Sequence, residues 1–248
     1  MTKSMPALRT ALATIHRDPR WWPKVLVGGA LMLSLVGYPL AVGMVMVSME
    51  HSRNGFPTPL PPWIDWTTRY LIGLFTLLID FVFFVMPLAL AGMLFFCVGL
   101  VTVVGPAVSP SVAGSVLHLV SLVAGLVLLM LFFSSVAPVA RLIFAQEGNI
   151  ADALGIQPLR RALSRPARRF FWRARLVSLP AYLPAGLLGL LLGTLSRTVF
   201  PGQSIVLLLI GWLFLSALLY AHLAVGQIYV AAEEEIARAE MEMRMPRC

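Results

Sequence analysis

Residues 141–175 read RLIFAQEGNIADALGIQPLRRALSRPARRFFWRAR and separate two long apolar stretches. This Arg-rich segment holds eight arginines, whereas its only acidic residues are Glu147 and Asp152. In membrane proteins, short loops rich in positive charge stay on the cytoplasmic side. The sequence therefore predicts a polytopic membrane protein in which the Arg-rich segment faces the cytoplasm.

The composition favours a membrane protein over a soluble one. Of the 248 residues, 59% are hydrophobic and 12% are charged, and the mean hydropathy is +0.86. A single soluble core cannot hide that much apolar surface. The net charge of +8 comes from basic residues at the ends of apolar stretches, where each gains about 1 kcal/mol from anionic lipid headgroups. We therefore expect membrane lipids as partners and no nucleic acid, and we expect Cys97 and Cys248 to be free thiols.

The chain is predicted to form one all-α membrane domain over residues 1–248. Its first apolar stretch, 25–49, is just long enough to cross a membrane once, but glycines and Pro39 interrupt it. A polar, Pro-rich loop follows over 50–69. The predicted segments are an interfacial amphipathic helix (1–24), a re-entrant or first span (25–49), spans over 70–105 and 112–140, the cytoplasmic Arg-rich segment (141–175), a final hairpin (176–195 and 204–231) and a cytoplasmic charged tail (232–248).

The number of crossings follows from charge. The basic amino end, the Arg-rich segment and the tail should all lie inside, so an even number of crossings must precede Arg141. Four spans plus a re-entrant hairpin over 25–49 satisfy this condition. Six spans also satisfy it, if residues 70–105 fold as two short spans. We favour four, because a turn at residues 86–88 would contain no polar side chain.

Asp80 is the most informative polar residue in a predicted span, since an acid there costs about 2.5–3.5 kcal/mol on insertion. It could be a proton or cation site that faces a water-filled path. Alternatively, it is protonated, or bonded to a Ser, Thr or backbone group of a neighbouring helix. The absence of a second acid in the predicted spans favours the second interpretation.

Three further polar residues lie in predicted spans: His118, His222 and Gln227. Two histidines on different helices could bind a metal, but no Cys, Glu or third His stands at ligand spacing from either. Hydrogen bonding between helices is therefore the favoured use, at about 0.6 kcal/mol each. His118 is close enough to the start of its span to reach lipid headgroups.

Two surface patterns predict contacts with lipids and helices. The first is a basic amphipathic surface with aromatic rings, which suits anionic lipid at the interface; its candidate residues are Arg165, Arg168, Arg169, Trp172 and Arg173. The second is a stripe of small residues at every fourth position, which lets two helix backbones approach closely. That stripe suits contact with a membrane-protein partner or a second copy, and equally suits packing within the chain; it consists of Ala185, Gly189 and Gly193.

Three local patterns resemble the uncharacterised prokaryotic membrane family known as domain of unknown function 4013. They are the Asp-Pro, Trp, Lys and Gly-pair opening over residues 18–29, the Leu-Pro-x-Trp-x-Asp loop over 60–65, and the Gly-Gln-x-Tyr element over 226–229. The resemblance implies a multi-helix membrane protein and supplies no activity.

We expect a non-catalytic integral protein of the bacterial or archaeal cytoplasmic (inner) membrane, with both termini inside, that acts as a structural or accessory subunit. The alternative is a permease-type component that moves a small solute, ion or lipid past Asp80, His222 and Gln227. A polar cavity reaching the middle of the membrane would favour the permease, whereas a core filled with Leu, Val and Phe would favour the accessory subunit. No catalytic motif or cofactor-binding motif occurs at recognisable spacing, so neither catalysis nor a cofactor is expected.

Overall fold

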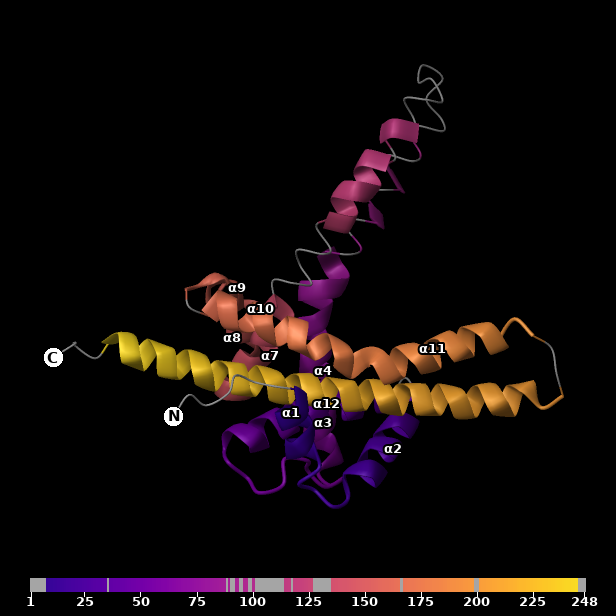
Figure 1. The fold of residues 1–248 in the computed structure, drawn as a ribbon, viewed down its shortest axis with the longest axis horizontal. Coiled ribbons are helices and arrows are strands. Elements are labelled where there is room, and N and C mark those ends of the chain that lie inside the picture. The colour runs from indigo at the N-terminus through magenta and orange to yellow at the C-terminus, as the bar shows by residue number, and fades with distance from the viewer. Residues whose placement is uncertain are drawn as a thin grey trace.

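A computed structural model gives the fold (Figure 1). It describes residues 8–34, 36–87, 89, 92–93, 96–97, 100, 114–116, 118–126, 135–165, 167–198 and 201–244, with the side chain of 244 excepted. The helices named in these ranges are α1 (Leu8–Ile15), α2 (Trp21–Met32), α3 (Gly37–Arg53), α4 (Trp66–Asp80), the π-helical turn η1 (Phe81–Val85), α7 (Val136–Glu147), α8 (Ile150–Leu154), α9 (Gln157–Leu163), α10 (Ala167–Ser178), the 3₁₀ turn η2 (Leu179–Tyr182), α11 (Leu183–Leu195) and α12 (Gln203–Arg244).

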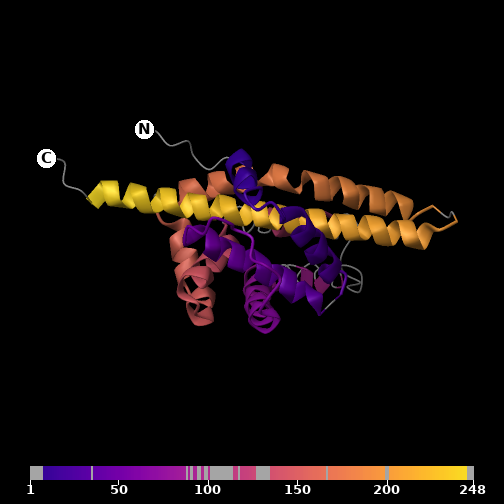
Figure 2. The same ribbon diagram turned by 90° about the horizontal axis from the view of Figure 1, so that it is seen from below.

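Helix α12 is the central element of the fold. Its 42 residues run across the whole molecule, and α1, α2, α3, α7, α10 and α11 all pack against it (Figure 1). Helix α11 lies beside one half of α12, as the second view confirms (Figure 2). The charged tail predicted over 232–248 is therefore the continuation of the last apolar helix as far as Arg244. It is also packed against protein, because Ile236 is fully buried.

The first apolar stretch forms two helices, α2 and α3, that are separated between Met32 and Gly37. The glycines that interrupt this stretch allow very close helix contacts. A Cβ atom on Gly29 would lie 2.7 Å from the backbone of Ser216 in α12, and one on Gly73 in α4 would lie 1.7 Å from the carbonyl oxygen of Pro39 in α3. Such contacts bring helix backbones together where apolar burial alone cannot drive association. The re-entrant path of this stretch stays a prediction.

Three described helical stretches are long and apolar enough to cross a membrane: Trp66–Val85, Ala167–Leu195 and Gln203–Met243. They correspond to the start of the predicted span over 70–105 and to the final hairpin. Most of the remainder of 70–105 and parts of 112–140 lie outside the described residues, so the count of four or six spans stays a prediction. Gly202 lies between the two segments of the predicted final hairpin and has a φ of 76°, which glycine adopts readily.

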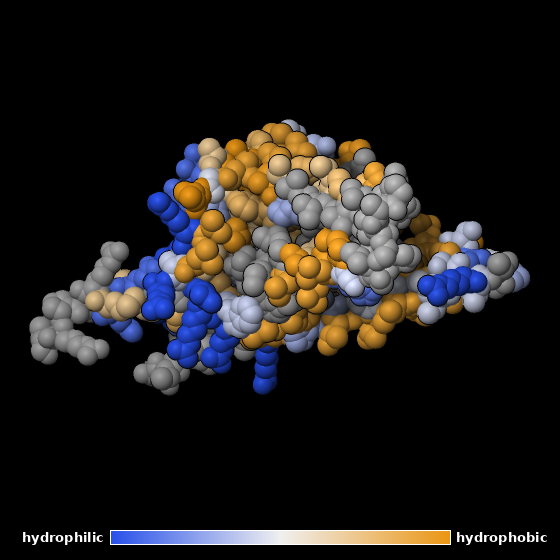
Figure 3. Space-filling model, turned by 90° about the horizontal axis from the view of Figure 1, so that it is seen from above, coloured by the Kyte–Doolittle hydropathy of each residue, from blue (hydrophilic) through white to orange (hydrophobic). Residues whose placement is uncertain are grey.

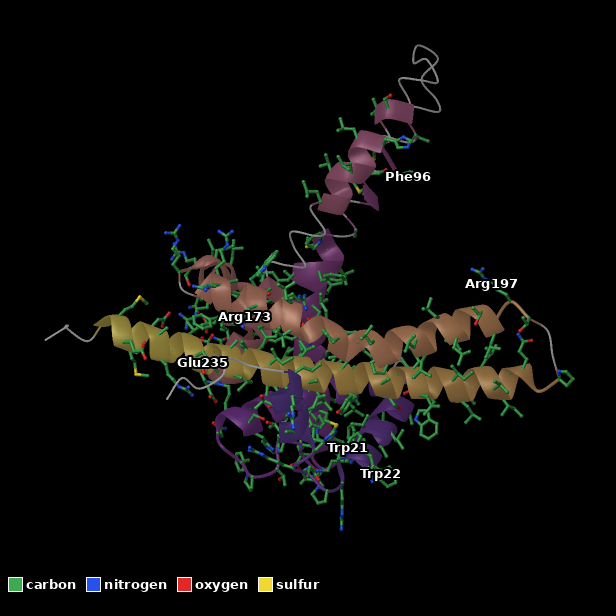
Figure 4. All side chains as sticks on the ribbon, viewed as in Figure 1. Trp21, Trp22, Phe96, Arg173, Arg197 and Glu235 are labelled. Atoms are coloured by element: carbon green, nitrogen blue, oxygen red, sulfur yellow. The ribbon has the colours of Figure 1, made fainter. Side chains whose placement is uncertain are left out.

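The surface of the molecule matches a membrane protein in the distribution of its side chains. On the face seen in Figure 3, hydrophilic residues gather over the left side and at the right tip, and hydrophobic residues cover most of the described surface between them. Arg197 lies at the tip of the α11–α12 pair, whereas Arg173 and Glu235 lie toward its opposite end (Figure 4). Along α11, Leu187 and Leu190 expose 67% and 69% of their surface. Exposed leucines on such long helices are compatible with lipid contact.

Helix α1 differs from its sequence-based interpretation. Its apolar face was expected to lie on lipid headgroups, but Ile15 is fully buried where α1 packs against α12. His16 extends the contact, with its Nε2 2.9 Å from the hydroxyl of Tyr220 and its ring beside Trp21. Protein and lipid tails are similarly apolar, so an amphipathic pattern alone does not identify which of the two covers the apolar face.

Candidate functional site

The central feature of the candidate site is an ion pair between two helices. Asp80 is the last residue of α4, and Arg141 lies in the middle of α7. The Arg141 Nε donates to the Asp80 Oδ1 at 2.8 Å, and its Nη2 donates to Oδ2. This bidentate arrangement is the strong form of an Arg–carboxylate contact. The two side chains expose only 20% and 23% of their surface, so the pair is largely removed from bulk solvent.

The ion pair lines a cavity of about 580 Å³, within the range of about 300–1,000 Å³ that is common for ligand sites. Its wall draws on α3, α4, η1, α7, α10, η2 and α12. Several polar side chains share it with the ion pair: Tyr38, Arg175, Tyr182, His222 and Tyr229. Tyr38 and Tyr182 thus line the same cavity as Arg141. The cavity therefore combines a cluster of polar side chains with a largely apolar wall.

Hydrogen bonds fix two of the lining residues from α12. The Nδ1 of His222 lies 2.8 Å from the carbonyl oxygen of Leu218, and its ring meets Tyr182 edge-on. Because a carbonyl only accepts, Nδ1 carries the proton in this contact, which leaves Nε2 as an acceptor when the ring is neutral. The hydroxyl of Tyr229 donates to the Oγ of Ser135 at 2.8 Å. Both rings are thus held in position before any ligand arrives.

The structure brings two of the four polar candidates, Asp80 and His222, to one cavity. Gln227 is elsewhere, and its Nε2 donates to the Oγ of Ser48 at 3.1 Å between α12 and α3. His118 is exposed, with its Nδ1 2.8 Å from the carbonyl oxygen of Gly114. The interhelical bond expected of such residues is present for Gln227 and absent for His118 within the described ranges.

The structure corrects the favoured interpretation of Asp80. Its partner is the Arg141 guanidinium, not a Ser, Thr or backbone group. In the sequence, Arg141 is the first residue of the Arg-rich segment, so its charge indicates a cytoplasmic loop. A signal was present in the sequence, because Arg141 is enclosed by apolar residues on both sides and belongs to the apolar run that forms α7.

The five candidate lipid-binding residues are all exposed in the structure. On the same helix, Ala167, Phe171 and Ala174 are buried, so α10 is amphipathic as the sequence indicated. Contact with anionic lipid stays a prediction. The residues concerned are Arg165, Arg168, Arg169, Trp172 and Arg173.

Arg161, at the same end of the molecule, ties α9 to the extension of α12. Its guanidinium donates to Glu233 at 2.9 Å and to Glu240 at 2.5 Å. Burial lowers the pKa of Arg161, but hydrogen bonds and charge from the two glutamates raise it by more, so the net shift is upward. The guanidinium of Arg161 therefore stays charged at any physiological pH.

The stripe of small residues packs largely inside the chain. Ala185 is buried, and a Cβ on Gly189 would lie 3.3 Å from the Phe214 ring of α12. Only Gly193 has no atom within 4 Å of its Cβ position. Of the two uses expected for the stripe, the described residues thus show the contact within the chain at two of its three positions.

Two of the sequence elements that carry the family resemblance meet in space. Lys24 donates to the Oδ2 of Asp18 at 2.5 Å and to the carbonyl oxygen of Leu60 at 2.7 Å. The indole of Trp63 donates back to the carbonyl oxygen of Lys24 at 3.3 Å. These bonds hold the Pro-rich loop against the start of α2. The elements around residues 18–29 and 60–65 are therefore joined to each other by hydrogen bonds.

The helical architecture with its charged cavity defines a candidate membrane protein with an internal polar site. Comparison with protein families identifies the chain more closely. It belongs to the family described as "Protein of unknown function (DUF4013)", which matches residues 26–194. The match confirms the resemblance and covers the loop over 60–65 and α2 from Leu26, while the element over 226–229 lies beyond it. Searches of curated proteins and of solved structures found no match.

Proposed function

We propose that this protein is a non-catalytic, permease-type membrane component whose central cavity takes up a small solute, ion or lipid. One observation carries the proposal: the Asp80–Arg141 ion pair lines a cavity whose wall is otherwise largely apolar. Removing charges from water is expensive, and a packed apolar contact of similar volume is often at least as stable. Charged groups at membrane depth commonly mark substrate or ion pathways for this reason.

The proposal includes an orientation and a location. The part of the Arg-rich segment between Arg141 and Arg175 and both termini face the cytoplasm, while Arg141 and Arg175 themselves line the cavity. The protein lies in the cytoplasmic membrane of a bacterium or archaeon. The positive charge of the segment supports this orientation. The position of Arg173 and Glu235 toward one end of the molecule, opposite Arg197, is compatible with a membrane between them.

A ligand-independent experiment tests the transport role. A permease exposes its central site to each side of the membrane in turn. In a variant without the native cysteines, Ala137→Cys places a thiol at the cavity wall with little change in volume. We expect a membrane-impermeant thiol reagent to label it when added to either side of oriented vesicles. Ile228→Cys is the matched control, because Ile228 is fully buried outside the cavity and should resist the reagent from both sides.

An accessory or structural subunit is the second candidate. The observation that favours it is the exposed apolar surface of α11, where Leu187 and Leu190 offer a face that lipid or another membrane protein could cover. Labelling of Ala137→Cys from one side only, or from neither, would exclude the permease and leave the accessory subunit. A stoichiometric membrane-protein partner recovered from mild lipid nanodiscs would then support that role.

A further inference from the structure

Three neutral polar groups of the cavity wall have no hydrogen-bond partner within the part of the chain that the structure describes. Two are the hydroxyl groups of Tyr38 and Tyr182, and the third is the Nε2 atom of His222. Because the Nδ1 proton of the neutral His222 ring is engaged with the carbonyl oxygen of Leu218, Nε2 can only accept. A polar group inside a protein is costly unless it forms a hydrogen bond. The cavity therefore offers a ligand two hydroxyl groups, which donate and accept, and one further acceptor.

The charged groups of the described wall do not select a charged ligand. Asp80 and Arg141 form a bidentate pair, so their charges largely offset each other. Arg175 already takes part in another interaction. A charged ligand would lose its hydration without meeting an opposite charge that is free of other contacts. Hydroxyl and ester groups are polar but uncharged, and they match the three neutral groups better.

Another part of the cavity wall is apolar and partly exposed. Phe81, Phe84 and Val85 line it, and they also expose 52%, 44% and 41% of their surface. They belong to the candidate membrane-spanning stretch Trp66–Val85. In a bilayer, the exposed part of these side chains would contact lipid chains. The same three residues thus join the interior of the cavity to the surface that lipid would cover.

We infer that the cavity binds an uncharged amphiphile with a hydroxyl-bearing head group, of which a monoacylglycerol is an example. The head group forms hydrogen bonds with Tyr38, Tyr182 and His222, and the hydrocarbon chain lies along the π-helical turn η1. The ligand reaches the cavity from the bilayer, because the apolar part of the wall is exposed. This inference rests on the proposed role of the cavity and names the chemical class of its ligand.

Photocrosslinking to the full chain in phosphatidylcholine nanodiscs tests the inference. The probe is a monoacylglycerol with a diazirine in its acyl chain, and we expect the crosslinked peptide to contain η1 (Phe81–Val85). Unlabelled monoolein should displace the probe at a concentration about tenfold lower than three competitors require. Methyl oleate has the same chain without a hydroxyl group, oleoyl lysophosphatidic acid adds negative charge, and glycerol is the head group alone.

Each competitor can overturn one part of the inference. Displacement by methyl oleate at the same concentration as monoolein would overturn the recognition of hydroxyl groups. Displacement by lysophosphatidic acid at the same or a lower concentration would overturn the preference for an uncharged head group. Displacement by glycerol at the same concentration would overturn the need for a chain and identify a small polyol as the ligand. Crosslinks confined to residues outside the cavity wall would overturn the site itself.

Variants locate the head group. Tyr38→Phe and Tyr182→Phe each remove one hydroxyl group and keep the ring, and each should weaken displacement by monoolein about fivefold. Their free energy of unfolding should stay unchanged, because neither hydroxyl bonds to a described residue. Tyr220→Phe is the matched control: it makes the same change on α12 outside the cavity, where the hydroxyl contacts His16, and it should alter displacement by less than about twofold. An equal loss in all three variants, or no loss at Tyr38 and Tyr182, would overturn the inference.

This test separates the inference from the transport role. Hydroxyl-dependent binding of monoolein, with Ala137→Cys closed to one or both sides, would keep the inference and refute transport. Labelling from both sides, with no preference for monoolein, would keep transport and refute the inference.

Discussion

Asp80→Asn should destabilise the protein strongly, because it leaves the Arg141 charge without its carboxylate partner. Breaking a buried ion pair from one side costs about 3–5 kcal/mol. The two side chains keep 20% and 23% of their surface exposed, so we expect the lower end, about 3 kcal/mol. At about 1.4 kcal/mol per factor of ten, the unfolding equilibrium constant should rise by about 150-fold. Arg141→Gln should cost less, about 2 kcal/mol, because the amide of the new Gln can still donate a hydrogen bond to the Asp80 carboxylate.

The double variant gives the coupling energy between Asp80 and Arg141, which decides whether the two side chains form an ion pair. In Asp80→Asn combined with Arg141→Gln, two neutral amides replace the charges and can bond to each other, so the loss should stay near about 2 kcal/mol and the coupling energy near about 3 kcal/mol. Tryptophan fluorescence during reversible unfolding in mixed micelles measures these differences. The exposed pair Glu234–Arg238 is the control cycle and should show a coupling below about 1 kcal/mol. Additive losses at Asp80 and Arg141, within about 0.5 kcal/mol, would refute the ion pair.

Three further predictions concern packing, topology and lipid contact. Gly73→Ala should cost about 2 kcal/mol or more in the same unfolding assay, because its Cβ would lie 1.7 Å from the Pro39 carbonyl oxygen, whereas Gly186→Ala, with no atom within 4 Å, should be neutral or stabilising. In a variant without native cysteines, Asn54→Cys should resist an impermeant thiol reagent on intact cells while Gln203→Cys reacts; labelling at both would require six spans. Replacing the surface arginines by Gln should weaken vesicle binding to anionic lipid and disturb orientation, and unchanged values of both would contradict their assigned role; the residues are Arg165, Arg168, Arg169 and Arg173.

Local features of the fold could be predicted because local sequence determines them. The break inside residues 25–49 follows from glycines and Pro39, and the hairpin turn near Gly202 follows from a residue that tolerates positive φ. The amphipathic face of α10 follows from the spacing of Ala167, Phe171 and Ala174. In each case, the residues that determine the feature lie within one or two helical turns of it in the sequence.

Features that depend on which helices become neighbours could not be predicted in the same way. Asp80 and Arg141 are 61 positions apart, and no periodicity in one helix identifies its partner in another. Arg141 also belongs to the apolar helix α7, whereas the arginine count of the loop treats it as one more cytoplasmic charge. The covering of α1 by α12 was missed because the sequence distinguishes polar from apolar surroundings, but does not distinguish a lipid from a protein neighbour.

The unbroken course of α12 has a mechanical consequence. At 1.5 Å per residue, its 42 residues make a rod of about 63 Å, roughly twice the thickness of a bilayer's hydrocarbon core. One part of the rod carries His222 and Tyr229 at the cavity, and another carries Glu233 and Glu240, which Arg161 holds. A tilt of about 10° about its midpoint would displace each end by about 5 Å. A rigid helix of this length would carry any change of angle at the cavity to both of its ends, where spin-label distances would report it.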